Sequence, residues 1–294
     1  RQWIIDRLPE SFATLQVALD LFKGMLENAL KDEINIFGDF PSLFMSLVGK
    51  NGEWEHYGGH LRFVDSQGNI VADNLSEDDY MNFLGEGVEK WSYLKFPYYK
   101  PLGYPEGIYR VGPLARINTC THVDTPKANA ELQAFRQQFN GTVNSSFLYH
   151  YARLIEILAC LEKIEILMDD PDLLSKRVRA EGGVNELEAV GVSEAPRGTL
   201  FHHYKVDENG IIEKVNLIIA TGQNNLAMNQ TVAQIAKQYI HNNDVQEGFL
   251  NRVEAGIRCF DPCLSCSTHA AGQMPLQIEL VNPVGEVIQT IVRD

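Results

Sequence analysis

Apolar residues recur every three or four positions in four stretches of the chain, the spacing that places side chains on one face of an α-helix. The stretches cover residues 15–30, 148–168, 230–242 and 245–258. The second has the widest apolar face, and Arg153 and Glu156 lie off it. We therefore expect a buried helix, a long helix, and two helices of ordinary length that lead to Cys259.

Other stretches alternate between apolar and polar residues, as half-buried strands do. Short runs broken by glycines between Phe44 and Val71 indicate a small antiparallel sheet. Two longer alternating runs, 200–204 and 211–219, flank Asn209-Gly210, and Asn-Gly is a strong hairpin signal. A second hairpin is expected from residues 277–281 and 287–292, around the turn at 282–285.

Two polar clusters predict further helix starts. Ser76 precedes three acidic residues, which is typical of a capped helix N-terminus. The turn at 169–172 indicates another helix after it. The fold class is therefore α+β and mainly α. We expect the chain to divide into a helical scaffold, a small α+β insertion, a helical core with the chemical motifs, and a tail, over residues 1–43, 44–106, 107–269 and 270–294.

Composition narrows the classes of function. The 294 residues are 45% hydrophobic, which is ordinary for a globular protein, and the net charge of −14 argues against a nucleic-acid partner. No uncharged apolar run reaches the roughly 18 residues of a membrane span. Five cysteines, mostly gathered near one end, fit reduced thiols better than a disulfide framework. We therefore expect a cytoplasmic protein.

Most of the candidate chemistry lies near the C-terminus. Cys259, Cys263, Cys266 and His269 fall within eleven residues. Thiolates are soft ligands for nickel, iron and zinc, and two that are separated by two residues can face one ion from a single turn. Pro262 favours that turn, because proline has a fixed φ and no N–H. These four side chains could alternatively form one tetrahedral site in a non-catalytic zinc-binding module.

Three strings resemble the [NiFe]-hydrogenase large (catalytic) subunit. Asp-Pro-Cys-x-x-Cys-x-x-His ends at His269 and is followed by Ala-Ala-Gly-Gln-Met-Pro-Leu, as in the C-terminal metal-binding motif of that family. The likeness is greatest to the NAD-linked bidirectional hydrogenases. The string 109–118 and the segment Glu-Ala-Pro-Arg-Gly at 194–198 are also similar to hydrogenase sequences.

The resemblance implies a long-helix bundle with small antiparallel sheets, and a nickel–iron centre with CO and cyanide ligands. Cys263 would bind nickel terminally, Cys266 would bridge nickel and iron, and His269 would bind a nearby magnesium. Arg197 would lie over the open coordination site, and Thr221, in a looser match, would contact a cyanide. Reversible H2 oxidation needs a proton acceptor, which either the Cys263 thiolate or Arg197 would provide.

The resemblance also implies partners. These are a small subunit with iron–sulfur clusters, NAD(P)-reducing diaphorase subunits, nickel-insertion chaperones and a maturation endopeptidase that cuts at His269-Ala270. The chain itself has no Gly-rich dinucleotide fingerprint. The family takes two further thiolates from an N-terminal Cys-x-x-Cys. We therefore expect an unprocessed tail, a missing N-terminal part, and a fragment that is inactive alone.

Several other residues have simpler interpretations. His56 and His60 in the predicted sheet are expected to be surface or sheet-face histidines, and Cys120 and His122 to be an inert thiol and a hydrogen-bonded imidazole. A quinone-reductase-type relative on the same scaffold is a third class, but such relatives normally lack the cysteines.

Overall fold

The computed structural model describes residues 1–28, 31–92, 94–179, 186–240, 247–263 and 276–293. Its helices are α1 (Gln2–Ile5), α2 (Leu8–Glu27), α3 (Lys31–Ile36), α4 (Tyr80–Phe83), α5 (Pro113–Thr119), α6 (Pro126–Phe139), α7 (Tyr149–Leu167), α8 (Ala220–Gln223), α9 (Asn225–Tyr239) and α10 (Glu247–Cys259). Short 3-10 helices occupy Glu77–Asp79, Lys100–Leu102, Ser146–Leu148 and Pro171–Leu174. The strands are β1 (Leu43–Val48), β2 (His60–Val64), β3 (Ile70–Leu75), β4 (Leu84–Val88), β5 (Lys95–Tyr99), β6 (Tyr109–Arg110), β7 (Glu188–Ala195), β8 (Gly198–Val206), β9 (Ile212–Ile218), β10 (Leu276–Val281) and β11 (Val287–Arg293).

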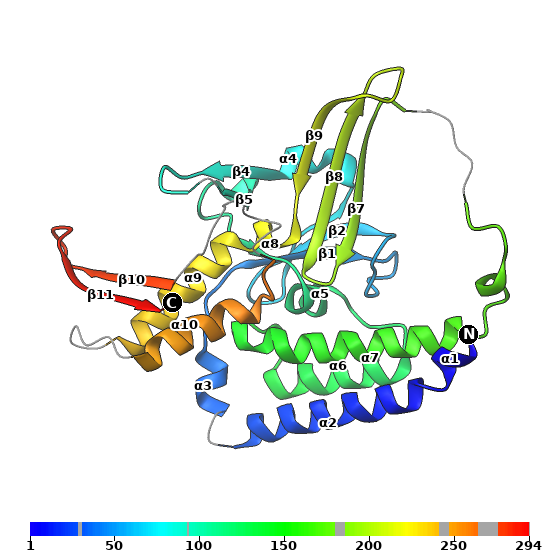
Figure 1. Ribbon diagram of the computed structural model, residues 1–294, viewed down its shortest axis with the longest axis horizontal. Coiled ribbons are helices and arrows are strands. Elements are labelled where there is room, and N and C mark those ends of the chain that lie inside the picture. The colour runs from blue at the N-terminus through cyan, green and yellow to red at the C-terminus, as the bar shows by residue number, and fades with distance from the viewer. Residues whose placement is uncertain (29–30, 93, 180–185, 241–246, 264–275, 294) are drawn as a thin grey trace.

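Three helices, α2, α6 and α7, lie side by side at the bottom of the molecule (Figure 1). Tyr151 of α7 joins them, since its ring centroid lies 5.3 Å from that of Phe22 in α2 and 5.2 Å from that of Phe135 in α6. Aromatic pairs at such distances add to the free energy of burial. The expected helices over 15–30 and 148–168 are thus confirmed, although α2 begins earlier, at Leu8.

The four-stranded sheet has the order β3-β2-β1-β6, in which β1, β2 and β3 pair antiparallel and β6 pairs parallel to β1. The antiparallel sheet expected between Phe44 and Val71 is therefore confirmed. All six residues of β1 are buried, because β1 contacts α5 as well as β7 and β8. Burial on both faces explains why its sequence is an apolar run rather than an alternation.

The three-stranded sheet β7-β8-β9 contains the expected hairpin, with Asp207–Gly210 between β8 and β9. The partner strand β7 was not predicted, because its apolar alternation is short: only Val190 and Val192 of this strand pack against the core. The helix expected after the turn at 169–172 is not found in the described residues, and residues 180–185 lie outside them. Only the 3-10 turn Pro171–Leu174 forms there, and the rest of the described chain up to 179 is not helical. Leu173, Leu174 and Val178 are exposed, and a short helix without packing is marginal in water.

The hairpin expected near the C-terminus is formed by β10 and β11. Leu280 and Ile291 pack against the core that joins the helices. Ser76 caps the 3-10 turn before α4 by accepting from the Asp78 N–H, as expected. The helices predicted over 230–242 and 245–258 are α9 and α10, with shifted ends.

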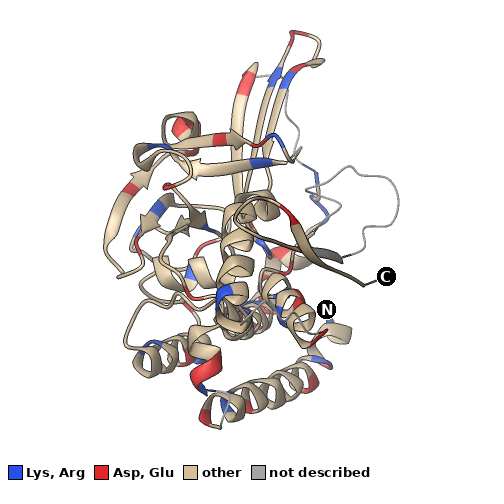
Figure 2. Cartoon of the chain, turned by 90° about the vertical axis from the view of Figure 1, so that its left-hand side faces the viewer, with Lys and Arg blue, Asp and Glu red and all other residues tan. Residues whose placement is uncertain are grey.

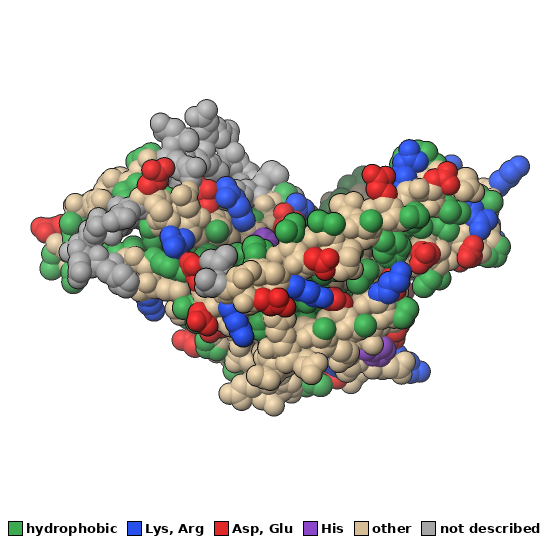
Figure 3. Space-filling model, turned by 90° about the horizontal axis from the view of Figure 1, so that it is seen from below, with side chains coloured by type: hydrophobic (Ala, Val, Ile, Leu, Met, Phe, Trp, Pro, Cys, Tyr) green, Lys and Arg blue, Asp and Glu red, His purple; other side chains and the backbone are tan. Residues whose placement is uncertain are grey.

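Charged residues of both signs are interspersed over the chain in Figure 2. Figure 3 shows the lower face, where hydrophobic side chains lie between acidic and basic ones. Exposed apolar residues on the lower helices include Val17 and Leu21 of α2, and such residues are ordinary on protein surfaces. Among the described residues, no helix has the length and apolar character of a membrane span.

Candidate metal centre

The end of α10 delivers the chain to the cysteine motif in a fixed orientation. Cys259 is the last residue of α10, and its carbonyl accepts from Arg153 Nη2 of α7 at 3.1 Å. Phe260 is buried, with its ring centroid 4.9 Å from that of Tyr149. Asp261 then takes a φ of +50°, which turns the chain away from the helix axis before Pro262.

Two residues expected near the metal centre lie together. The Cys263 backbone N–H donates to Thr221 Oγ1 of α8 at 3.1 Å. Thr221 is buried, so its hydroxyl is held where it can accept this hydrogen bond. The bond ties α8, which follows β9, to the cysteine motif, which follows α10. Thr221 therefore lies beside Cys263, as its proposed role requires.

Arg197 reaches the same segment from a third direction. It lies in the turn between β7 and β8, and its Nε donates to the carbonyl oxygen of Asp261 at 2.5 Å. The same Nε lies 3.3 Å from Asp261 Oδ2. The guanidinium is thus fixed two residues before Cys263. Cys266, His269 and Ala270 lie outside the described residues.

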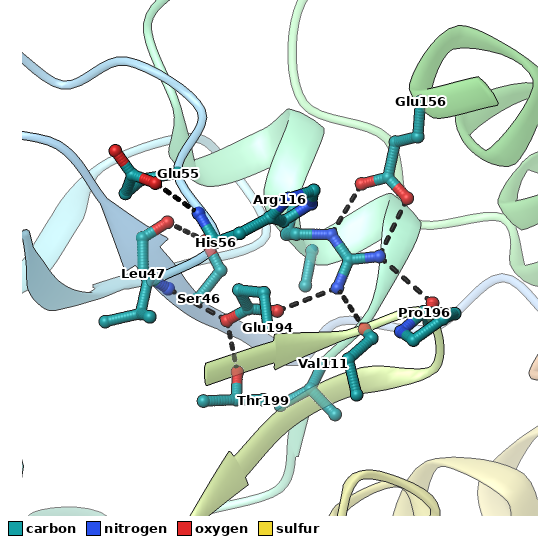
Figure 4. A network of polar contacts seen from close by, with 12 residues as sticks. Ser46, Leu47, Glu55, His56, Val111, Arg116, Glu156, Glu194, Pro196 and Thr199 are labelled. Carbon is teal, nitrogen blue, oxygen red and sulfur yellow. Dashed lines mark hydrogen bonds and ion pairs between the residues drawn. The ribbon is translucent and has the colours of Figure 1, made fainter. Parts of the chain in front are cut away.

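A buried network behind this turn was not predicted (Figure 4). The Arg116 guanidinium of α5 donates to both carboxylate oxygens of Glu156 at 2.5 and 2.7 Å, and to Glu194 Oε2 at 2.7 Å. Trp54 Nε1 also donates to Glu156 Oε1, at 3.1 Å. Burial lowers the Arg116 pKa, but the two carboxylates outweigh burial, so the pKa is raised and the charge is held.

A signal for this network was present in the sequence. Arg116 and Glu194 lie within two of the strings that resemble hydrogenase sequences. Glu156 was expected off the apolar face of its helix, yet it is buried, as is Glu162. A charged residue on a helix that is apolar almost all round indicates a buried partner.

Backbone packing joins the same two strings. A Cβ added to Gly112 would lie 2.7 Å from the Arg197 carbonyl oxygen, and one added to Gly198 would lie 2.3 Å from Val111 Cγ2. Both glycines have positive φ, +98° and +142°. Close backbone approach therefore requires glycine at both positions. The string 109–118 and the turn that bears Arg197 are one packing unit.

The zinc-module alternative is not supported. Cys259 is fully buried in the hydrophobic core, and its Sγ donates to the Ala255 carbonyl of its own helix at 3.2 Å. Burial raises the pKa of this thiol to about 12, which agrees with a thiol of the hydrophobic core. Within the described ranges, no three His, Cys, Asp or Glu side chains are grouped to hold a metal, and Cys266 and His269 lie outside those ranges.

The other sequence candidates have structural partners. The His56 ring packs on Trp54 at 4.2 Å, and His60 Nε2 pairs with Asp73 at 2.8 Å. Cys120 is buried, and burial raises its pKa to about 11, which agrees with an inert thiol. His122 Nδ1 lies 2.8 Å from the Thr121 hydroxyl.

The fold and the site together define a mainly helical subunit that brings a cysteine motif, a buried hydroxyl and a guanidinium to one place. Comparisons with known proteins agree. A family model described as nickel-dependent hydrogenase matches residues 54–269. The beta subunit of the NAD-reducing hydrogenase HoxS of Cupriavidus necator is 44% identical over 260 residues, which are 87% of this chain and 53% of that protein.

Two further comparisons point the same way. An F420-non-reducing hydrogenase protein of Methanothermobacter thermautotrophicus is 40% identical, over 95% of this chain and 58% of that protein. The crystal structure of an NAD+-reducing [NiFe]-hydrogenase in the H2-reduced state matches with a TM-score of 0.84 and 41% identity, over 90% of this chain and 58% of that chain. A [NiFeSe] hydrogenase from Desulfovibrio vulgaris Hildenborough shares the fold, with a TM-score of 0.59 and 18% identity.

This chain belongs to the nickel-dependent hydrogenase family and has the fold of its large subunit. The resemblance stated from the three strings is thereby confirmed. The chain spans little more than half the length of the curated relatives it matches.

The donor set of the described residues fits the metal centre that the family implies. Cys263 is disulfide-bonded in this structure, contrary to the expected reduced thiol. Once reduced, it would offer a soft sulfur ligand, and its backbone is held by Thr221. Arg197 brings a permanent positive charge to the same segment, which suits an anionic metal–thiolate cluster.

Proposed function

We propose that this chain, in the complete protein, is the part of a nickel–iron hydrogenase large subunit that carries out reversible H2 oxidation. The observation that carries the proposal is the meeting of Thr221, Arg197 and the Cys263 segment, which come from three separate parts of the chain. Arg197 and Cys263 lie in strings that resemble the family's motifs, and Thr221 lies in a looser match. The similar proteins are hydrogenases, which supports the reaction class.

In this proposal Cys263 and Cys266 hold the nickel–iron centre with its CO and cyanide ligands, and His269 holds magnesium. When bound, the centre supplies the redox-active Lewis acid at which H2 is split. Thr221 orients the Cys263 backbone and borders the cyanide side. Arg197 holds a positive charge over the open side, and the Cys263 thiolate would accept the proton, because a charged guanidinium has no acceptor atom.

The electrons need a path that this chain does not contain. We propose a small subunit with iron–sulfur clusters and diaphorase subunits that reduce NAD(P), in the cytoplasm. The likeness to the NAD-reducing HoxS beta subunit supports this assembly. The thiolates that complete the nickel site would come from a further segment of the large subunit, so the fragment alone would be inactive.

We also propose that the sequence is that of a precursor. Nickel-insertion chaperones would load the site, and a maturation endopeptidase would then cut at His269-Ala270. The separate hairpin β10-β11, which follows that bond, supports a detachable tail.

Replacing Arg197 tests the proposal directly. In the assembled, processed enzyme, Arg197→Lys is expected to lower turnover by about 10²-fold or more, since one preorganised charged donor is commonly worth about 10²–10³ in rate. Lysine keeps the charge but loses the planar guanidinium. Turnover would be measured by H2-dependent dye reduction, and nickel and iron by elemental analysis.

Arg258→Lys is the matched control. Arg258 is the exposed arginine next to Cys259, and its Nη2 pairs with Glu254 at 2.8 Å. This variant should keep full turnover. Unchanged turnover in Arg197→Lys, with normal metal content, would remove Arg197 from the proposed site.

A further inference from the structure

The turn that bears Arg197 is only two residues long and is held from behind by a single side chain. Ala195 pairs with Gly198 at the ends of β7 and β8, so Pro196 and Arg197 form the turn. Arg116 Nη1 donates to the Ala195 carbonyl at 2.9 Å, and Nη2 donates to the Pro196 carbonyl at 3.0 Å. The two peptide carbonyls that precede Arg197 are therefore both fixed by one guanidinium.

That guanidinium has little freedom to move. It is 1% exposed, and its Nε and Nη2 bind Glu156 in a two-point contact while Nη1 binds Glu194. The fork geometry of arginine allows all of these contacts at once. Glu156 belongs to α7, so Arg116 links the turn to the long helix of the bundle.

The network also closes on the turn itself. Glu194 lies in β7, separated from the turn by Ala195. Its Oε1 accepts from the Thr199 hydroxyl at 2.7 Å and from the Leu47 N–H at 2.9 Å. Thr199 lies on the opposite strand, immediately after Gly198. Both strands that lead into the turn are therefore linked to one buried carboxylate, and through Leu47 to β1.

From these contacts we infer that Arg116 is a positioning residue for Arg197. Arg116 fixes the peptide carbonyls before Arg197, and so sets the direction from which its guanidinium reaches the Asp261–Cys263 segment. This inference rests on the proposed role of Arg197. The described contacts of Arg116 are to Glu156, Glu194 and the carbonyls of Ala195 and Pro196, so its effect on turnover would pass through Arg197.

A double-mutant cycle in the assembled enzyme tests the inference. Arg116→Lys keeps the buried charge, but one ammonium cannot hold two carboxylates and two carbonyls in this geometry. Turnover is expected to fall at least about tenfold, with an unchanged KM for H2 and normal nickel and iron, because an interaction that acts only in the transition state is lost. In an Arg197→Lys background, the same change should alter turnover by less than about twofold.

A milder variant covers the case in which Arg116→Lys does not assemble. Thr199→Val removes one donor to Glu194 and keeps the side-chain shape. It should lower turnover by a few-fold in the Arg197 enzyme and leave the Arg197→Lys enzyme unchanged. Arg136→Lys is the matched control, since Arg136 also binds backbone carbonyls, those of Ile117, Cys120 and Thr121, but not those of the turn. It should not change turnover.

The outcomes separate this inference from the proposed function. If Arg197→Lys leaves turnover unchanged, the proposed function fails first. Suppose that Arg197→Lys lowers turnover greatly, and that Arg116→Lys and Thr199→Val lower it by the same factor with or without Arg197→Lys. Arg116 then acts independently of Arg197, and the inference is overturned. A loss that disappears in the Arg197→Lys background supports it.

Discussion

Arg116, Glu156 and Glu194 place one positive and two negative side chains in the protein interior. Burial raises the pKa of Glu194, while Arg116 and the Thr199 hydroxyl act to lower it. Removing one member of such a group leaves an uncompensated charge, which costs far more than the intact group contributes. The network therefore specifies one arrangement of the Arg197 turn, even though apolar residues could pack the same volume.

Gly198 shows how tightly this turn is packed. Gly198→Ala should destabilise the chain by roughly 1–3 kcal/mol, because a Cβ would strain the backbone at φ +142° and press on Val111. Thermal or denaturant unfolding would measure the change. Gly191→Ala in β7 is the control, since a Cβ there meets nothing within 4 Å, and a change within about 0.5 kcal/mol is expected. Equal effects of the two changes would contradict this packing.

At the scale of elements, the charged side chains of α7 bind three other helices, which the apolar face of α7 alone does not predict. Glu162 accepts from the Lys127 and Ala128 N–H groups at the start of α6, at 2.9 and 2.8 Å. Glu156 binds Arg116 of α5, and Arg153 binds the Cys259 carbonyl at the end of α10. The helix α7 thus contacts Arg116, which holds the Arg197 turn, and the end of α10, which leads to Cys263.

His150, on the first turn of α7, makes the stability of this arrangement pH-dependent. Burial, and next Arg153, lower its pKa to about 4 from an ordinary value of 6.5. The unfolded chain then binds more protons between these values, so stability is full above about pH 6.5 and is lost as the pH falls toward 4.

Comparison with His150→Asn isolates this contribution. The difference in unfolding free energy between the two proteins should change by roughly 1–2 kcal/mol between pH 7 and pH 5, at about 1.4 kcal/mol per pKa unit. Denaturant unfolding across that range measures it. A difference that stays constant with pH would show that His150 is not the titrating group.

At the scale of the whole molecule, the tail is attached to the core without being part of a larger sheet. Its strands β10 and β11 pair only with each other among the described residues, and Leu280 and Ile291 contact the core beside α9 and α10. None of the described hydrogen bonds among Arg197, Asp261, Cys263 and Thr221 involves the tail.

Incubation of the nickel-loaded precursor with its maturation endopeptidase is expected to release a peptide that begins at Ala270. Mass spectrometry would identify it. Nickel-free precursor is the control and should stay intact. A mature native chain that still ends at Asp294 would defeat the processing proposal.

Local pattern was sufficient for most elements, because helical spacing and Asn-Gly turns depend on neighbours in sequence. The long helix α7, the hairpin β8-β9 and the tail hairpin were predicted in this way. Strand β7 was missed because its apolar alternation is limited to Val190 and Val192, which is too short to stand out in the sequence. The helix expected after 169–172 is not found in the described residues, because its apolar side chains there are exposed.

The sequence by itself determined the family, the cysteine motif and the candidates Arg197, Thr221 and Cys263, because short strings carry the types of donor that a metal centre needs. Only the tertiary structure decided that Arg197 and Thr221 reach the same segment, that Cys259 is a core thiol, and that Arg116 fixes the Arg197 turn. Those contacts join residues 42 to 80 positions apart, apart from the Cys259 bond within its own helix. Which distant groups meet depends on how helices and sheets pack, and no local spacing records it.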